Sequence, residues 1–71
     1  MAYTQADLDM ANRHIAEAER HIVRQEEIIT DLGAKSADTN LAEELLAEFR
    51  ATLRMHREDR DLIARELGQS T

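Results

Sequence analysis

The chain has 71 residues, a formal net charge of −6, and no cysteine, proline or tryptophan. Without cysteine it is neither a disulfide-stapled secreted module nor a thiolate metal site. Its acidic balance argues against binding nucleic acid through the phosphate backbone, which requires clustered Lys and Arg. Its apolar runs are too short to span a membrane, and its first residues lack the basic and apolar regions of a secretion signal. We therefore expect a cytoplasmic protein with no nucleic-acid or membrane partner.

The small size of the chain favours association. A chain of this length buries only ~60% of the surface that its unfolded form exposes. Small chains without disulfides or metals often gain the missing burial from a partner. We expect one small domain over residues 1–71 that needs another chain beside it.

Helix-forming residues dominate the composition, and the first helix is expected over about residues 4–33. Ala, Leu, Glu and Arg are the commonest types and are strong helix formers. The Thr4 hydroxyl can accept a hydrogen bond from the backbone N–H of Asp7, whose carboxylate can reach back to form a capping box. Gly33 suits the left-handed position that ends a helix.

The interior turn residues predict a link over about residues 34–38. Asp38 is the preferred N-cap of the second helix, with Thr39 and Asn40 as close competitors. The second helix is expected over about residues 39–67. Gly68 marks its end, and residues 68–71 are expected to form a frayed tail.

Both expected helices carry a heptad repeat, in which positions a and d form an apolar stripe. In the first helix, Leu8 and every seventh residue after it occupy position a. In an antiparallel hairpin the two stripes pair as Leu8/Ile63, Ala11/Arg60, Ile15/His56, Ala18/Leu53, Ile22/Phe49, Gln25/Leu46 and Ile29/Ala42. The centre of this pairing falls between Lys35 and Ser36, inside the link. The sequence therefore predicts an all-α fold, an antiparallel two-helix hairpin.

The apolar residues of both helices exceed what one partner helix can cover. Those outside the stripe are Ala16, Val23, Ile28, Leu41, Leu45, Met55 and Leu62. A homodimer that forms a four-helix bundle is the simplest closed solution, because a two-fold interface lets the same strip cover itself. A hairpin that docks onto another protein's helices would show the same pattern. The predicted core and interface residues are Leu8, Ile15, Ile22, Ile28, Ile29, Leu45, Leu46, Phe49, Leu53 and Ile63.

Three polar residues, Gln25, His56 and Arg60, interrupt the apolar stripe. We interpret them as setting the register and the oligomeric state, with a ligand-facing role as the alternative. The Arg60 guanidinium is expected to reach toward Asp7 or Glu17.

The histidines are the side chains best suited to chemistry near neutral pH. His14, Glu17 and His21 lie along one edge of the first helix, and His56 lies near the level of His14. Such a cluster could bind a divalent transition metal. Against this, His14 and His21 are about 10 Å apart along the helix axis, and hydrogen-bonded imidazoles at a helix interface are the simpler interpretation. No cofactor is expected.

Features of an enzyme are missing from the sequence. Gly33 and Gly68 are isolated, so no glycine-rich loop is available to cradle a phosphate. A long, thin hairpin also lacks the concave pocket that an active site normally needs. We therefore do not expect catalysis.

One resemblance covers most of the chain, from Leu8 to Ile63. The stretch 19–29, together with Asp38-Thr39, Ala42, Leu45-Leu46, Phe49, Leu53, His56 and Arg60, resembles small bacterial helical-hairpin proteins of unknown function. The resemblance implies a bacterial origin and a helical hairpin, and it carries over no activity, substrate or ligand.

These observations together predict a small structural or interaction protein. It would self-associate through its helix faces and could scaffold or bind another helical protein. One alternative is a small metal- or ligand-binding helical bundle that uses its histidines. Another is an acidic antitoxin-like or chaperone-like subunit whose partner is a different polypeptide.

Overall fold

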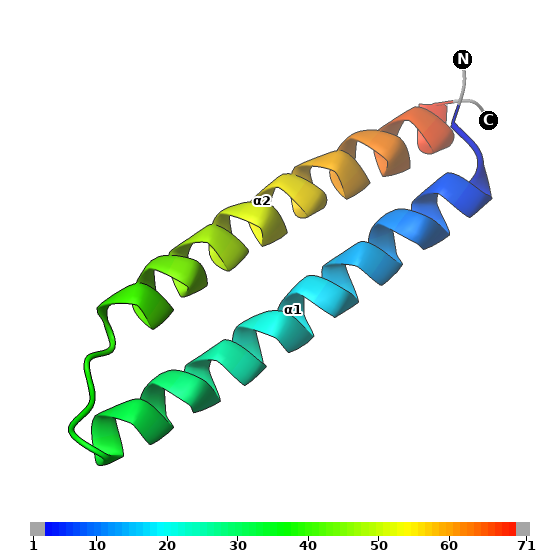
Figure 1. Cartoon of the computed structure of the whole chain (residues 1–71). Helices are drawn as coiled ribbons and strands as arrows, with labels where there is room; N and C mark the ends of the chain where they lie inside the picture. Colours follow the sequence, from blue (N-terminus) through cyan, green and yellow to red (C-terminus); the bar gives the residue numbers. More distant parts are fainter. Residues whose placement is uncertain (1–2, 70–71) are drawn as a thin grey trace.

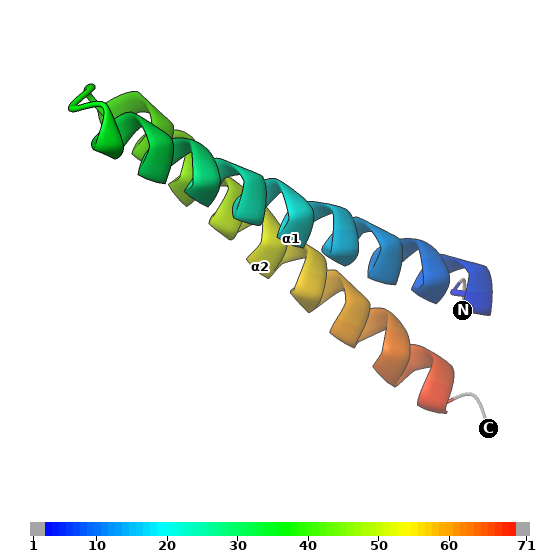
Figure 2. The same ribbon diagram turned by 90° about the horizontal axis from the view of Figure 1, so that it is seen from below.

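The computed structural model describes residues 3–69, which form two antiparallel helices (Figure 1). Helix α1 spans Gln5–Ala34 and helix α2 spans Asn40–Gln69. The hairpin is a rod whose Cα extents are 56 × 14 × 13 Å. Seen from below, the two helices cross obliquely as they run side by side (Figure 2). The expected all-α hairpin is confirmed for the described residues, which contain no strand.

The start of α1 is fixed by the predicted capping box. Thr4 has an extended backbone with φ −123° and ψ 169°, so it is the N-cap and Gln5 is the first helical residue. The backbone N–H of Asp7 donates to Thr4 Oγ1 at 3.3 Å, and the backbone N–H of Thr4 donates to Asp7 Oδ2 at 2.9 Å. The two bonds form the reciprocal capping box that fixes the first turn.

The end of α1 differs from the prediction that Gly33 adopts the left-handed conformation. The helix continues through Ala34, and Ser36 takes the left-handed position with φ 57°. The N–H of Ala37 donates to the Leu32 carbonyl at 2.9 Å, and the N–H of Ser36 donates to the Gly33 carbonyl at 3.1 Å. This pair of bonds is a Schellman motif, in which glycine is the usual left-handed residue. Ser36 therefore adopts a left-handed backbone conformation that is strained for a residue with a Cβ. The sequence had predicted this conformation for Gly33, which adopts it without strain.

Helix α2 begins one residue later than the preferred N-cap implied. Thr39, one of the competitors, is the N-cap, because its carbonyl accepts from the N–H of Glu43 at 2.9 Å. Asp38 Oδ1 instead accepts from the N–H of Asn40 at 2.9 Å, so it satisfies the first helical donor from outside the helix. At the other end, α2 continues past Gly68 to Gln69. The rest of the predicted frayed tail, residues 70–71, lies outside the described residues.

The seam between the helices follows the predicted pairing to within one residue. The rings of His14 and His56 lie 5.2 Å apart, and those of His21 and Phe49 lie 5.6 Å apart, one heptad further toward the link. The most buried side chains are Ala11, Ile15, Gln25, Leu46 and Leu53, and none of the described residues is below 2% exposure. Two helices alone therefore leave even the best-covered seam residues partly accessible.

The predicted core is covered unevenly. Ile15, Leu46 and Leu53 are buried, whereas Leu45 is 40% exposed. The other predicted core residues are half-buried: Leu8, Ile22, Ile28, Ile29, Phe49 and Ile63. Leu45 lies beside the seam at heptad position g, among the apolar residues that one partner helix was expected to leave uncovered.

Candidate interaction surface

One side of the seam is closed by charge. Glu19 pairs with Arg57 at 3.3 Å, and Glu26 pairs with Arg50 at 3.2 Å, both from α1 to α2. All four residues occupy heptad position e, and the two e rows of an antiparallel pair lie on the same side. We call these four residues the charged flank. Their side chains are about half exposed, between 49% and 57%, so each ion pair contributes at most about 1 kcal/mol.

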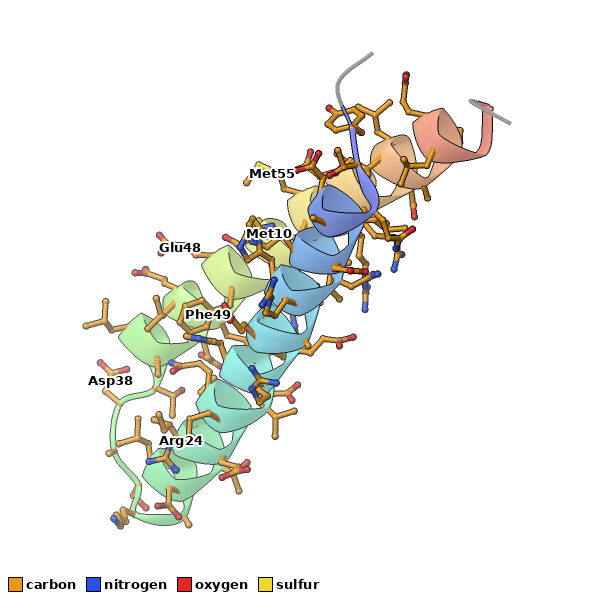
Figure 3. All side chains as sticks on the ribbon, turned by 90° about the vertical axis from the view of Figure 1, so that its right-hand side faces the viewer. Met10, Arg24, Asp38, Glu48, Phe49 and Met55 are labelled. Carbon is orange, nitrogen blue, oxygen red and sulfur yellow. The ribbon has the colours of Figure 1, made fainter. Side chains whose placement is uncertain are left out.

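The opposite side of the seam is apolar and open. It exposes five large apolar side chains at heptad positions c and g: Met10, Leu41, Leu45, Met55 and Leu62. We call these five residues the apolar flank, and Met10 and Met55 can be followed in Figure 3. Met10 lines a surface hollow together with His14 and Asp59. Leu41 and Leu45 line a second hollow together with Leu32 and Ala42. These neighbours lie on or beside the seam, on the same side. Met55 and Leu62 lie two and three heptads after Leu41, respectively, and therefore share its helix face.

The apolar flank holds most of the exposed large apolar side chains of the described residues. The remaining two are Tyr3, before α1, and Val23, at position b near the charged flank. Leu41 is the most accessible of all, with 79% of its surface exposed. A gathering of exposed apolar side chains on one side of a molecule, with polar residues among and around them, is typical of an interaction site.

A hollow of about 250 Å³ lies within the open side, midway along the rod, and we call it the histidine hollow. It is lined by His14, Glu17, Ala18, His21, Phe49, Thr52 and His56. His14 and His56 face each other with their ring planes tilted by 45°. His21 instead packs against Phe49 with its ring plane at 71°, in an edge-on contact. Phe49 can be followed in Figure 3.

The metal-ligand interpretation needed His14, Glu17, His21 and His56 to converge. The structure brings His14 and His56 together, but His21 is one heptad away and its ring is engaged by Phe49. Over residues 3–69, no three His, Asp or Glu side chains form a group that could hold a metal ion. The physical reason is the rise of the helix, which separates residues seven apart by about 10 Å.

The polar residues of the seam behave differently from one another. The Gln25 side chain is buried, and its Nε2 donates to the Ala42 carbonyl at 2.8 Å. This hydrogen bond joins the two helices near the link. Arg60 is half-buried, but its Nε donates to Asp61 at 2.7 Å, not to Asp7 or Glu17 as expected. The stem of Arg60 covers the seam while its head group turns along α2 rather than across to α1.

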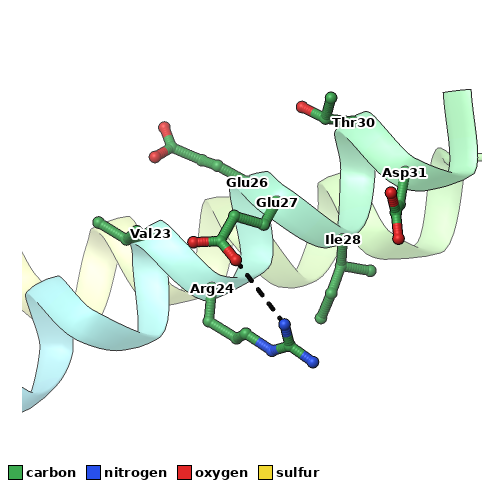
Figure 4. Close-up of a pocket in the computed structure, with 7 residues that line it drawn as sticks. All are labelled: Val23, Arg24, Glu26, Glu27, Ile28, Thr30 and Asp31. Carbon is green, nitrogen blue, oxygen red and sulfur yellow. Dashed lines mark ion pairs between the residues drawn. The ribbon is translucent and has the colours of Figure 1, made fainter. Parts of the chain in front are cut away.

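A further depression lies on the outer side of α1 and is bounded by that helix alone (Figure 4). Arg24 and Glu27 form an ion pair there at 3.7 Å, with both side chains well exposed. Figure 4 shows Arg24 and Ile28 projecting from the same side of α1. Arg24 occupies heptad position c and Ile28 position g, so both residues lie on the open side of the seam.

The sequence did not lead us to predict the ion pairs of the charged flank or the exposed position of Met10. The signal for the ion pairs was present, since Glu19, Glu26, Arg50 and Arg57 all occupy position e. Met10 occupies position c, as Leu41, Met55 and Leu62 do. Antiparallel geometry therefore places Met10 on the open side with them.

Comparisons with known proteins add no further assignment. No protein-family model matches the chain, and neither curated proteins nor solved structures gave a match. The resemblance to bacterial helical-hairpin proteins therefore stays a prediction. Neither helix is long and apolar enough, over the described residues, to cross a membrane.

Proposed function

We propose that this protein is a helical interaction module that self-associates through the apolar flank to form a two-fold four-helix bundle. The observation that carries the proposal is the one-sided exposure of Met10, Leu41, Leu45, Met55 and Leu62. Apolar surface drives association roughly in proportion to the area removed from water. The charged flank offers no comparable gain, because its groups are already paired across the seam.

The exposed area supports the same proposal. The chain exposes 5268 Å², whereas a compact protein of 8.1 kDa exposes about 4,500 Å². The excess is roughly 800 Å², which is about what each partner buries in an interface of standard size. The radius of gyration, 16.3 Å, likewise exceeds the ~11 Å expected for a compact chain of this length. A second rod laid alongside the first would remove the excess of exposed area.

A second copy is the favoured occupant because a two-fold axis makes one apolar strip cover another like it. Four-helix bundles are built in this way, from helices packed at shallow angles around a shared apolar core. The half-buried residues Ile22, Ile28 and Phe49 would then gain the cover that a single hairpin cannot give. An amphipathic helix of a different protein could fit the same surface, and this is an outcome that the experiment below separates.

The experiment compares two exposed apolar residues on opposite sides of the seam. Met55, on the apolar flank, is 55% exposed, and Val23, near the charged flank, is 54% exposed. We expect Met55→Glu to weaken self-association at least about tenfold, since it places a charge in an apolar interface. Val23→Glu, the matched control, should leave the association unchanged. Sedimentation equilibrium measures both.

Two results would contradict the proposal. One is a wild-type chain that sediments at 8.1 kDa through the micromolar range, which would leave the apolar flank for a different polypeptide. The other is an equal effect of the two substitutions, which would show that the apolar flank is not the interface.

A further inference from the structure

We propose that the two-fold axis of the self-associated form runs parallel to the long axis of the rod, so that α1 of each copy lies against α2 of the other. This inference rests on the proposed self-association and deepens it. The alternative closed arrangement has its axis across the rod, so that α1 lies against α1 and α2 against α2. Both arrangements keep neighbouring helices antiparallel, so the side chains on the open side must decide between them.

The axial level of each residue is fixed by contacts within one chain. The His14–His56 and His21–Phe49 contacts set which residue of α2 lies level with each residue of α1. A two-fold axis along the rod leaves axial levels unchanged. Each residue of α1 therefore meets the partner's α2 within one helical turn, about 5.4 Å, of the level that it has within its own hairpin, with no free sliding.

In this arrangement four of the facing pairs are complementary. At the outer positions, Met10 faces Leu62 and Arg24 faces Glu48 of the second copy. Closer to the seam, Ile28 faces Leu45, and His14 faces Asp59, whose carboxylate can accept a hydrogen bond from the imidazole. Each of these contacts occurs twice by symmetry. The mismatched pairs are Glu17 with Met55, Asp31 with Leu41 and Asp7 with Glu66, while His21 with Thr52 is neutral.

The arrangement with its axis across the rod matches fewer positions. It pairs Glu17 with Arg24 and Leu41 with Leu62. The facing pairs that it leaves mismatched are Met10 with Asp31, His14 with Ile28, Leu45 with Asp59, and Glu48 with Met55. A carboxylate held against an apolar side chain loses hydration without gaining a partner. Fewer such losses occur when α1 lies against the partner's α2.

Arg24 and Glu48 are the most informative pair. Both are exposed and occupy heptad position c on the open side, and Arg24 forms an ion pair with the exposed Glu27 of its own helix. Reorientation of Arg24 toward Glu48 of a second copy would therefore exchange one weak surface pair for a pair at an interface.

The absence of cysteine makes the arrangement directly testable. Arg24→Cys and Glu48→Cys chains are unfolded, mixed in equal amounts, refolded and treated with a short bis-maleimide reagent. Covalent dimer is then measured by denaturing electrophoresis. We expect at least about tenfold more covalent dimer from this mixture than from a mixture of Glu17→Cys and Arg24→Cys. Arg54→Cys, on the side of the charged flank, is the matched control and should not be joined to Glu48→Cys.

Each other outcome overturns a defined part of the account. Preferential joining of the Glu17→Cys and Arg24→Cys chains would place the axis across the rod. Joining of neither pair, while the wild-type chain sediments at twice 8.1 kDa, would overturn the arrangement and leave the self-association standing. A wild-type chain that sediments at 8.1 kDa would overturn the proposed function itself.

Discussion

The two sides of the helix–helix seam differ in the kind of side chain that they present to water. The charged flank, made of Glu19, Glu26, Arg50 and Arg57, pairs its groups across the seam and presents a hydrated surface. The apolar flank leaves large side chains in water beside a row of imidazoles. In a single hairpin, the charged groups on one side of the seam are therefore paired, whereas the large apolar side chains on the other side lack cover. Seam residues determine how the two helices of one chain pair, and the difference between the flanks is the basis for proposing that a partner binds to the apolar flank.

The difference also has an energetic side. Exposed ion pairs contribute little, because two long side chains lose conformational freedom in order to meet in water. Apolar surface that remains exposed forgoes roughly 25 cal/mol for each square ångström left uncovered. The charged flank thus favours the antiparallel register but adds little to the free energy of unfolding. The apolar flank offers most of the further stabilisation, because its surface remains exposed in a single hairpin.

The largest expected effect comes from the seam, against which both flanks are to be compared. Leu53 is 8% exposed, and Leu53→Ala should lower the free energy of unfolding by about 3 kcal/mol, since it removes buried methyl groups and leaves a cavity. Urea denaturation at fixed protein concentration measures the change. A loss below about 1 kcal/mol would mean that Leu53 is not part of the core. Arg54→Ala, at the exposed neighbouring position away from the apolar flank, is the control.

The charged flank should respond far more weakly. A double-mutant cycle of Glu19→Gln and Arg57→Gln should give a coupling energy of about 0.5 kcal/mol that decreases as salt is added, because the pair is exposed. Thermal or urea unfolding of the four proteins supplies the cycle. The Glu26 and Arg50 pair provides an independent repeat. A coupling of about 2 kcal/mol or more in either cycle would show that the flanks do not differ as described.

The smallest effects lie in the link, which sets the level of the two helices and so determines which residues meet on each flank. Gly33 is helical, and a Cβ there would have no atom within 4 Å. Gly33→Ala should therefore stabilise the chain by about 0.7 kcal/mol. Ser36→Gly should stabilise it by about 0.5 kcal/mol, because glycine adopts positive φ without strain but adds freedom to the unfolded chain. Destabilisation by Gly33→Ala would indicate that residue 33, and not Ser36, adopts the left-handed conformation.

Sequence periodicity accounts for the pairing but not for the helix ends. Heptads starting at Leu8 predict the seam, because side-chain direction follows directly from position along a helix. The choice between Gly33 and Ser36 depends on how the link must turn to bring α2 alongside α1. That requirement is set by both helices together and leaves no mark in the local sequence. Asp38 and Thr39 differ for the same reason, since either can cap a helix.

The candidate surface was predictable in part. Leu41, Leu45, Met55 and Leu62 stand outside the heptad stripe in the sequence, and the structure leaves all of them exposed. The separation of His21 from His14 was predictable, because residues seven apart on a helix lie about 10 Å apart along its axis. The contact partner of each ring was not predictable, since the packing of side chains across the seam places His14 against His56 and His21 against Phe49.

The central claim is that a single hairpin leaves too much apolar surface in water to exist alone. Multi-angle light scattering of the wild-type chain, coupled to size-exclusion chromatography at micromolar concentration, tests it most directly. The account predicts a particle of twice 8.1 kDa, with a Met55→Glu chain eluting later and weighing half as much. A wild-type particle of 8.1 kDa, folded and helical by circular dichroism, would contradict the claim.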